Sequence, residues 1–198
     1  PVLTEASRAA NFTNEGGVDG RVRFLHNVMG LWLLSECVRE WGHDDLPALL
    51  EQAAALTTPV PVFDANDPRF LAPGDMPGRI AQWLREHDQP VPENHAVFVR
   101  SIVESLAAAF AAAVRTASEL SGKTVSTIHI VGGGSLNELL CQRTADAAGI
   151  PVLAGPVEAT AIGNVLIQAR AQGFVDGSLE SLRALVAAAF APKRYLPH

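Results

Sequence analysis

Three consecutive glycines, Gly132, Gly133 and Gly134, constrain this chain more than any other feature of its sequence. They follow a run of β-branched and apolar residues at 125–131 and precede a helical pattern at 136–148. Glycine permits positive φ and lets a ligand approach where a Cβ would otherwise stand. The helix that follows offers unpaired N–H groups and the positive end of its dipole. This order suits a nucleotide, although most such glycines only make a tight turn.

The spacing of these glycines excludes two familiar nucleotide motifs. It fits neither G-x-G-x-x-G nor G-x-x-x-x-G-K-[ST], so the dinucleotide and P-loop interpretations fail. A strand at 150–153 and helices at 158–172 and 178–190 are expected to follow. Strands that alternate with helices predict an α/β arrangement for this part of the chain.

The earlier part of the chain is expected to be mainly helical. Residues 2–13 suggest a strand that ends in a glycine-bearing turn. The apolar spacing predicts a helix over 21–41 that stops at Gly42, and a second one, capped by Asp44 or Asp45, that ends near Leu56. Two further helices are expected over 77–87 and 93–121.

The segment 57–78 differs in composition from its surroundings. Because it contains five prolines, we expect an irregular excursion with one edge strand at 60–63. Its acids are interpreted as turn residues and not as metal ligands; they are Asp64, Asp67 and Asp75. No metal-binding residue is predicted in the chain.

Charge and composition exclude several classes of protein. The 198 residues carry a formal net charge of −6 without a basic block, so we expect no nucleic-acid partner. Cys37 and Cys141 stand in apolar patterns and suggest reduced thiols of a cytoplasmic protein. The apolar stretch 102–114 is short and interrupted by Glu104, so no membrane span is expected. The chain begins with Pro1 directly in patterned sequence, which suggests a fragment.

Several stretches of this sequence resemble one family. Residues 128–137 and 142–152 are similar to the adenosine-binding signature of the FGGY sugar kinases, and 158–164 completes the pattern. Two other stretches resemble the rhamnulokinases of that family: one joins 11–17 to 24–34, and the other spans 63–77. The resemblance covers nearly the whole chain in the order typical of the family.

This resemblance implies a fold and a function. The fold would be a ribonuclease-H-like lobe of the actin and hexokinase type, with a mixed sheet flanked by helices. Residues 1–198 would form a single C-terminal domain that contains the 57–78 excursion. ATP with Mg²⁺ would phosphorylate L-rhamnulose. Gly132, Gly133, Gly134 and Asn137 would bind the nucleotide, and Asn27 the sugar.

The same resemblance implies that an N-terminal lobe is missing. The catalytic aspartate and the first phosphate loop would lie upstream of Pro1, so no catalytic residue is expected here and the isolated chain should be inactive. One position departs from the family, because Ser35 stands where rhamnulokinases carry a glutamine near ATP. A nucleotide contact at Ser35 is therefore in doubt.

Three alternatives remain open from the sequence. The chain could belong to another FGGY kinase that acts on xylulose, glycerol or a similar substrate. It could also be a non-catalytic, actin-like nucleotide-binding lobe. At the level of one residue, Asn27 could be a hydrogen-bonded core amide on a helix instead of a sugar contact.

Overall fold

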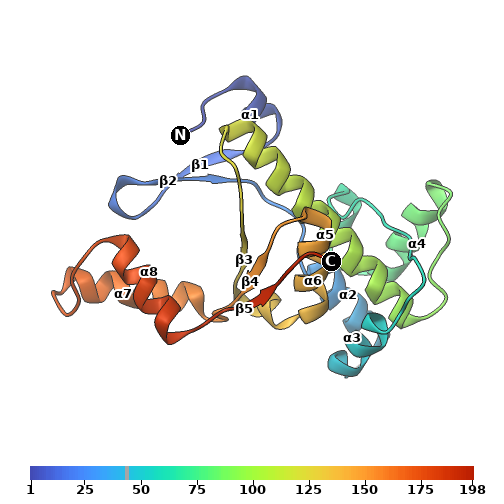
Figure 1. Ribbon diagram of the computed structural model, residues 1–198. Helices are drawn as coiled ribbons and strands as arrows, with labels where there is room; N and C mark the ends of the chain where they lie inside the picture. The colour runs from blue at the N-terminus through green and yellow to red at the C-terminus, as the bar shows by residue number, and fades with distance from the viewer. Residues whose placement is uncertain (43–44) are drawn as a thin grey trace. The chain divides into compact units, whose positions relative to one another are not determined.

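The computed structural model describes residues 1–42 and 45–198 (Figure 1). Its internal contacts divide the chain into two compact units. The first unit comprises residues 1–27 and 114–198, and the second comprises residues 28–113. The longest helix, α5 (His95–Ser121), contributes to both units.

The second unit is built from helices around an apolar core. In chain order they are α2 (Trp32–Trp41), α3 (Leu46–Ala54), the 3₁₀ turn η2 (Pro68–Phe70), α4 (Met76–Glu86) and the first part of α5. The expected end signals are confirmed at two of them. Gly42 ends α2 with φ of +60°, and the Asp45 carboxylate caps α3 by accepting the Ala48 N–H at 3.0 Å. Asp44, the other candidate cap, lies outside the described residues.

The irregular excursion expected over 57–78 ends at residue 75, because α4 begins at Met76. The edge strand expected at 60–63 is wrong, because that stretch is not a strand in the described structure. Side chains of α5 replace a neighbouring strand: the Ser101 hydroxyl donates to the Pro61 carbonyl at 2.6 Å, and the Phe63 N–H donates to the Ser105 hydroxyl at 3.0 Å. These bonds satisfy buried backbone groups without a sheet.

The first unit begins with a helix and a hairpin that the sequence pattern did not predict. The strand expected within residues 2–13 is wrong, because they contain α1 (Glu5–Ala9), which is started by reciprocal hydrogen bonds between Thr4 and Ser7. Next come β1 (Thr13–Gly16), the turn η1 (Val18–Gly20) and β2 (Val22–Leu25), with β1 and β2 antiparallel. The helix predicted from residue 21 therefore begins eleven residues later, at Trp32, because 22–25 pair with β1 instead.

The rest of the first unit is a mixed sheet with helices. Strand β3 (Ile128–Ile130) is parallel to β4 (Val152–Ala154), and β4 is antiparallel to β5 (Lys193–Tyr195). The helices are α6 (Glu138–Ala148), α7 (Ala159–Ala171) and α8 (Leu179–Ala189). They agree with the predicted positions to within two residues, whereas β5 was not predicted.

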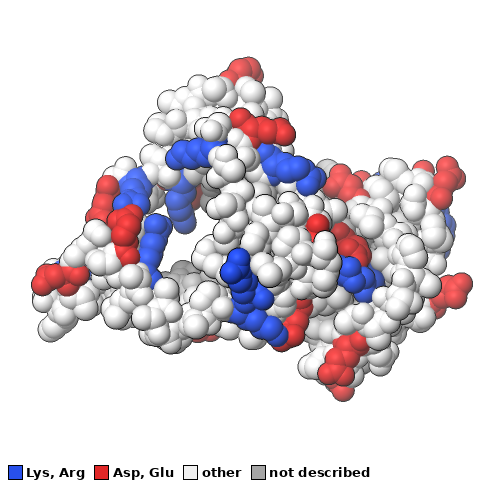
Figure 2. Space-filling model, in the orientation of Figure 1, with Lys and Arg blue, Asp and Glu red and all other residues white. Residues whose placement is uncertain are grey.

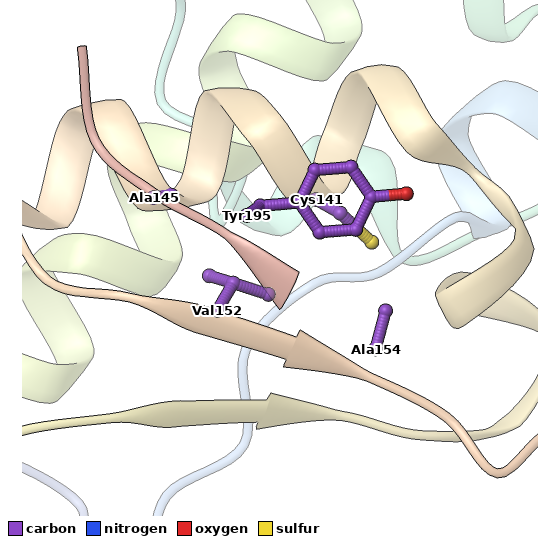
Figure 3. Packing of buried hydrophobic residues seen from close by; sticks show 5 residues of the cluster. All are labelled: Cys141, Ala145, Val152, Ala154 and Tyr195. Atoms are coloured by element: carbon purple, nitrogen blue, oxygen red, sulfur yellow. The ribbon is translucent and has the colours of Figure 1, made fainter. Parts of the chain in front are cut away.

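One face of this sheet carries a small apolar core. Cys141 and Ala145 of α6 pack against Val152, Ala154 and Tyr195 of the sheet (Figure 3). Side chains of β3 alternate between the two faces of the sheet. Ile128 and Ile130 pack against the same cluster, whereas His129 lies on the opposite face. Helix α6 is thus fixed to the sheet just after the glycine segment.

Helix α5 is the one described helix that is long and apolar enough, by length and composition, to cross a membrane. Of its most apolar 18-residue stretch, 56% is buried inside the protein. Val99, Ile102, Val103 and Leu106 are fully buried in the second unit, together with the polar Ser101. This packing is typical of the core helix of a globular unit.

Candidate functional site

The three glycines form the 3₁₀ turn η3 (Gly132–Leu136), which joins β3 to α6. Gly132 has φ of +75°, a conformation that favours glycine strongly. The turn is closed from within, because the Ser135 hydroxyl donates to the Gly132 carbonyl at 2.7 Å. The backbone conformation alone therefore explains why residue 132 is a glycine.

Gly133 is different, because the fold does not demand a glycine there. Its φ lies outside the positive region, and a Cβ added to it would meet no other heavy atom within 4 Å. A larger residue would fit this isolated turn without strain. The fold thus leaves room for a ligand beside Gly133, and a nucleotide contact at Gly132, Gly133 and Gly134 stays a prediction.

Asn137 begins helix α6 and does not lie in its first turn, where the sequence pattern placed it. Its side-chain Oδ1 accepts the Leu140 N–H at 3.0 Å, which makes Asn137 the N-cap. The residue is 6% exposed. Its Oδ1 is thus occupied by the helix, so a nucleotide contact at Asn137 stays a prediction and would fall to its amide nitrogen.

Two residues that shape the glycine turn were not predicted to belong to the site. Ser135 is buried and closes the turn as described. The Cys141 thiol lies 3.8 Å from the Gly134 carbonyl and 3.9 Å from the Ser135 carbonyl. Burial raises the pKa of Cys141 to about 11, so this thiol is a packing group and not a nucleophile. A serine directly after glycines was the available signal for the first of them.

Asn27 is exposed and lies in the segment between β2 and α2, not on a helix. The interpretation of Asn27 as a core amide on a helix is therefore wrong, and its role as a sugar contact stays a prediction. Ser35 lies on α2 and is exposed.

The face of the sheet opposite α6 borders a cavity of about 700 Å³. It lies between β3 and α8, and most of its lining is apolar; its walls include His129, Val131, Leu179, Arg183 and Phe190. The sequence pattern did not predict this cavity. The described part of the chain holds no cluster of three or more His, Cys, Asp or Glu residues able to bind a metal ion.

Comparison with known proteins supports the resemblance. Residues 1–172 match the C-terminal domain of the FGGY family of carbohydrate kinases. The chain is 43% identical over 197 residues to a rhamnulokinase of Bacteroides thetaiotaomicron. That match covers 100% of the chain but 40% of the relative, so the chain spans well under half of that protein.

The fold has a solved counterpart. A crystal structure of xylulose kinase from Rhodospirillum rubrum matches 95% of this chain with a TM-score of 0.62 and 17% identity, over 38% of that protein. At this identity the match shows the fold alone. It confirms the predicted mixed α/β lobe of the ribonuclease-H-like, actin and hexokinase type.

Proposed function

Since the chain belongs to the FGGY family of carbohydrate kinases, as a C-terminal domain, we propose that it forms the nucleotide-binding half of an ATP-dependent rhamnulokinase. The complete enzyme would transfer the γ-phosphoryl group of ATP to a primary hydroxyl of L-rhamnulose and release L-rhamnulose 1-phosphate. The choice of sugar is supported by the 43% identity to a rhamnulokinase across the whole chain.

The observation that carries the nucleotide site is the position of Gly133, with its open side, in the turn between β3 and α6. The space beside its Cα is free of other atoms, and the N-terminus of α6 follows within a few residues. Adenosine could rest on this backbone, and the helix end would favour its phosphates. The glycine turn therefore fits ATP or ADP.

The chain's residues do not fit a resident Mg²⁺ site in the same way, because the described residues offer no cluster of acids for it. We assign no metal ligand and no general base to this chain. Phosphoryl transfer depends on positioning and on neutralising charge. We propose that the N-terminal lobe of the complete enzyme contributes the base and the first phosphate loop.

A substitution at Gly133 tests the nucleotide site. Gly133→Val in the complete enzyme should abolish ATP and ADP binding in calorimetry while the circular dichroism and melting temperature stay at wild-type values. Gly16→Val is the matched control, because Gly16 also has open space around its Cα and no positive φ. A folded Gly133→Val variant with wild-type affinity would place the nucleotide elsewhere.

The substrate is tested separately. A coupled assay for ADP release should show higher kcat/KM for L-rhamnulose than for xylulose, glycerol or gluconate. Faster turnover of another of these substrates would overturn the rhamnulose assignment and leave the kinase class intact. Chain 1–198 alone, with Mg-ATP and L-rhamnulose, should form no sugar phosphate detectable by mass spectrometry.

A further inference from the structure

Strand β3 lies at one edge of its sheet, and one side of its backbone faces away from the other strands. The Ile128 N–H donates to the Pro151 carbonyl at 2.9 Å, and the Ile130 carbonyl accepts the Gly155 N–H at 2.8 Å. Backbone groups of successive residues point to opposite sides of a strand, so the N–H and carbonyl of His129 point away from β4. No described strand pairs with that side of β3.

The sequence around β3 is suited to a longer strand than the one observed. The run of β-branched and apolar residues covers 125–131, whereas pairing with β4 covers 128–130. The chain leads into β3 through residues 123–127, which have no regular structure (Figure 1). A neighbour on the free side of β3 could pair with the part of this run that β4 does not reach.

The two edges of this sheet differ in their chemistry. Strand β5 forms the opposite edge and carries Lys193 and Arg194, with Pro192 and Pro197 close by. Charge and proline at an edge discourage pairing with a further strand. The run 125–131 contains no proline, and none of its residues is formally charged at pH 7. This edge therefore lacks the features that protect an exposed edge strand.

The cavity of about 700 Å³ lies beside the same strand. His129 and Val131 line it from β3, and Leu179 and Val186 line it from α8. Val131 is exposed, and so is Phe190, which also lines the cavity. Side chains of a strand placed beside β3 would point alternately toward this cavity and toward the face that α6 covers. Such a strand would cover apolar surface that is otherwise open to water.

We propose that a strand from the part of the complete protein outside residues 1–198 pairs with the free edge of β3 and covers this cavity. The chain is a C-terminal domain and covers 40% of the rhamnulokinase that it matches, so the larger part of such a protein is available to supply the strand. Backbone hydrogen bonds would give the pairing its affinity. The added strand would be apolar at the alternate positions that face α8.

Hydrogen exchange in the complete protein tests this pairing, because two successive amides of β3 face opposite sides. The Ile128 N–H is bonded to the chain beside β4, and the His129 N–H would be bonded to the added strand. Both should exchange at least about 100-fold slower than in an unstructured peptide, as measured residue by residue by NMR. Fast exchange at His129 beside slow exchange at Ile128 would overturn the proposal.

Two variants of the complete protein separate the backbone hydrogen bond from the side chain. His129→Pro removes the N–H on the free edge and keeps the bonds to β4, whereas His129→Ala keeps that N–H and removes the ring. Proline is tolerated where the N–H would face solvent, but not where it belongs to a ladder. His129→Pro should therefore melt at least about 2 °C below His129→Ala. Equal melting temperatures would contradict the pairing, and the exchange measurement on wild type decides if His129→Pro does not fold.

The source of the strand is tested by dilution, with the mass in solution measured by light scattering. Slow exchange at His129 in a monomeric complete protein supports a strand from the same chain. Protection that disappears when a dimer is diluted to monomers would assign the edge to a second copy and overturn the proposal. The proposal depends on the chain's place in a longer protein and not on the choice of sugar. A protected edge in a protein that phosphorylates no sugar would overturn the proposed function alone.

Discussion

The two units of this chain are held together by different forces. The second unit buries large side chains from every one of its helices, among them Leu33, Leu49, Ile80 and Ile102 at 0–2% exposure. In the first unit, no described residue of α7 is buried, and Leu182 is the buried residue of α8. Apolar burial is the largest favourable term in folding. The second unit should therefore be the more stable of the two.

Charges hold the helices of the first unit where apolar packing is thin. Arg170 of α7 makes two hydrogen bonds to the Asp19 carboxylate, at 2.7 and 3.1 Å, across 151 residues of sequence. Arg21 pairs with Glu180 of α8 at 2.6 Å. Figure 2 shows acidic and basic side chains close to one another on the surface. Exposed pairs of this kind contribute little each and weaken in salt.

The largest effect is expected from a cavity in the second unit. Ile102→Ala removes a fully buried side chain of α5 and should lower the free energy of unfolding by about 2–5 kcal/mol in urea titrations of chain 1–198. Val165→Ala is the control in the first unit, because Val165 of α7 is 65% exposed. It should cost less than about 0.5 kcal/mol. Equal losses for the two variants would remove the difference between the units.

A buried guanidinium should show the next largest effect. Arg100 is 6% exposed and donates to the carbonyls of Ala53 and Leu56, at 3.0 and 3.3 Å, beside the end of α3. Arg100→Met keeps the length of the side chain but leaves these carbonyls without that donor, at a cost of about 1–3 kcal/mol in the same titration. Arg85→Met, on an exposed arginine of α4, is the control and should be near neutral.

Helices with local end signals were the easier elements to predict from sequence. Helices α3, α4 and α5 show apolar spacing, and residues such as Asp45 and Gly122 mark their ends, so neighbouring residues suffice to define them. The first unit depends on distant pairing. Strand β5 is recognisable only through its partner β4, some 40 residues earlier, and β2 only through β1.

The candidate site was predictable in outline but not in detail. The position of the site, in a glycine turn between a strand and a helix, follows from the local sequence pattern. The distinction between Gly132, which the backbone requires, and Gly133, which it does not, needed φ angles and neighbouring atoms. The N-cap role of Asn137 needed the true start of α6, and helix boundaries are poorly defined by sequence.

Breaking the ion pair at Asp19 should loosen α7 without unfolding the second unit. Asp19→Asn removes the charge that Arg170 binds, and hydrogen exchange in peptides of α7 should become faster. The difference from wild type should shrink as salt is added. Glu5→Gln, which breaks the exposed pair with Arg8 in α1, should leave exchange in α7 unchanged.

The pH dependence of this pair has a definite sign. Its hydrogen bonds with Arg170 lower the pKa of Asp19 from its ordinary value of 3.8. The stabilisation is therefore fully present above that value, and it is lost as the pH falls through the lower pKa of the folded protein. Wild type and Asp19→Asn should differ at pH 7 and converge as the pH falls through the lowered pKa of Asp19. Equal exchange at pH 7 and low salt would show that α7 is held by something else.

The smallest effect, and the most direct comparison of the units, comes from their two cysteines. Cys37 belongs to the second unit and Cys141 to the first; both are free and buried. Burial raises the pKa of Cys37 to about 12 and that of Cys141 to about 11. Since the thiolate is the reactive form, both should resist alkylation at pH 8 in the native protein, with Cys141 the faster of the two. In sub-denaturing urea the difference between the two alkylation rates should widen, because the first unit, with its thinner packing, opens first.

The single-thiol variants Cys37→Ser and Cys141→Ser report each unit separately. Each is labelled with iodoacetamide, and the labelled fraction is measured by mass spectrometry. Faster labelling of Cys37 than of Cys141 would reverse the stability order of the two units and refute the comparison.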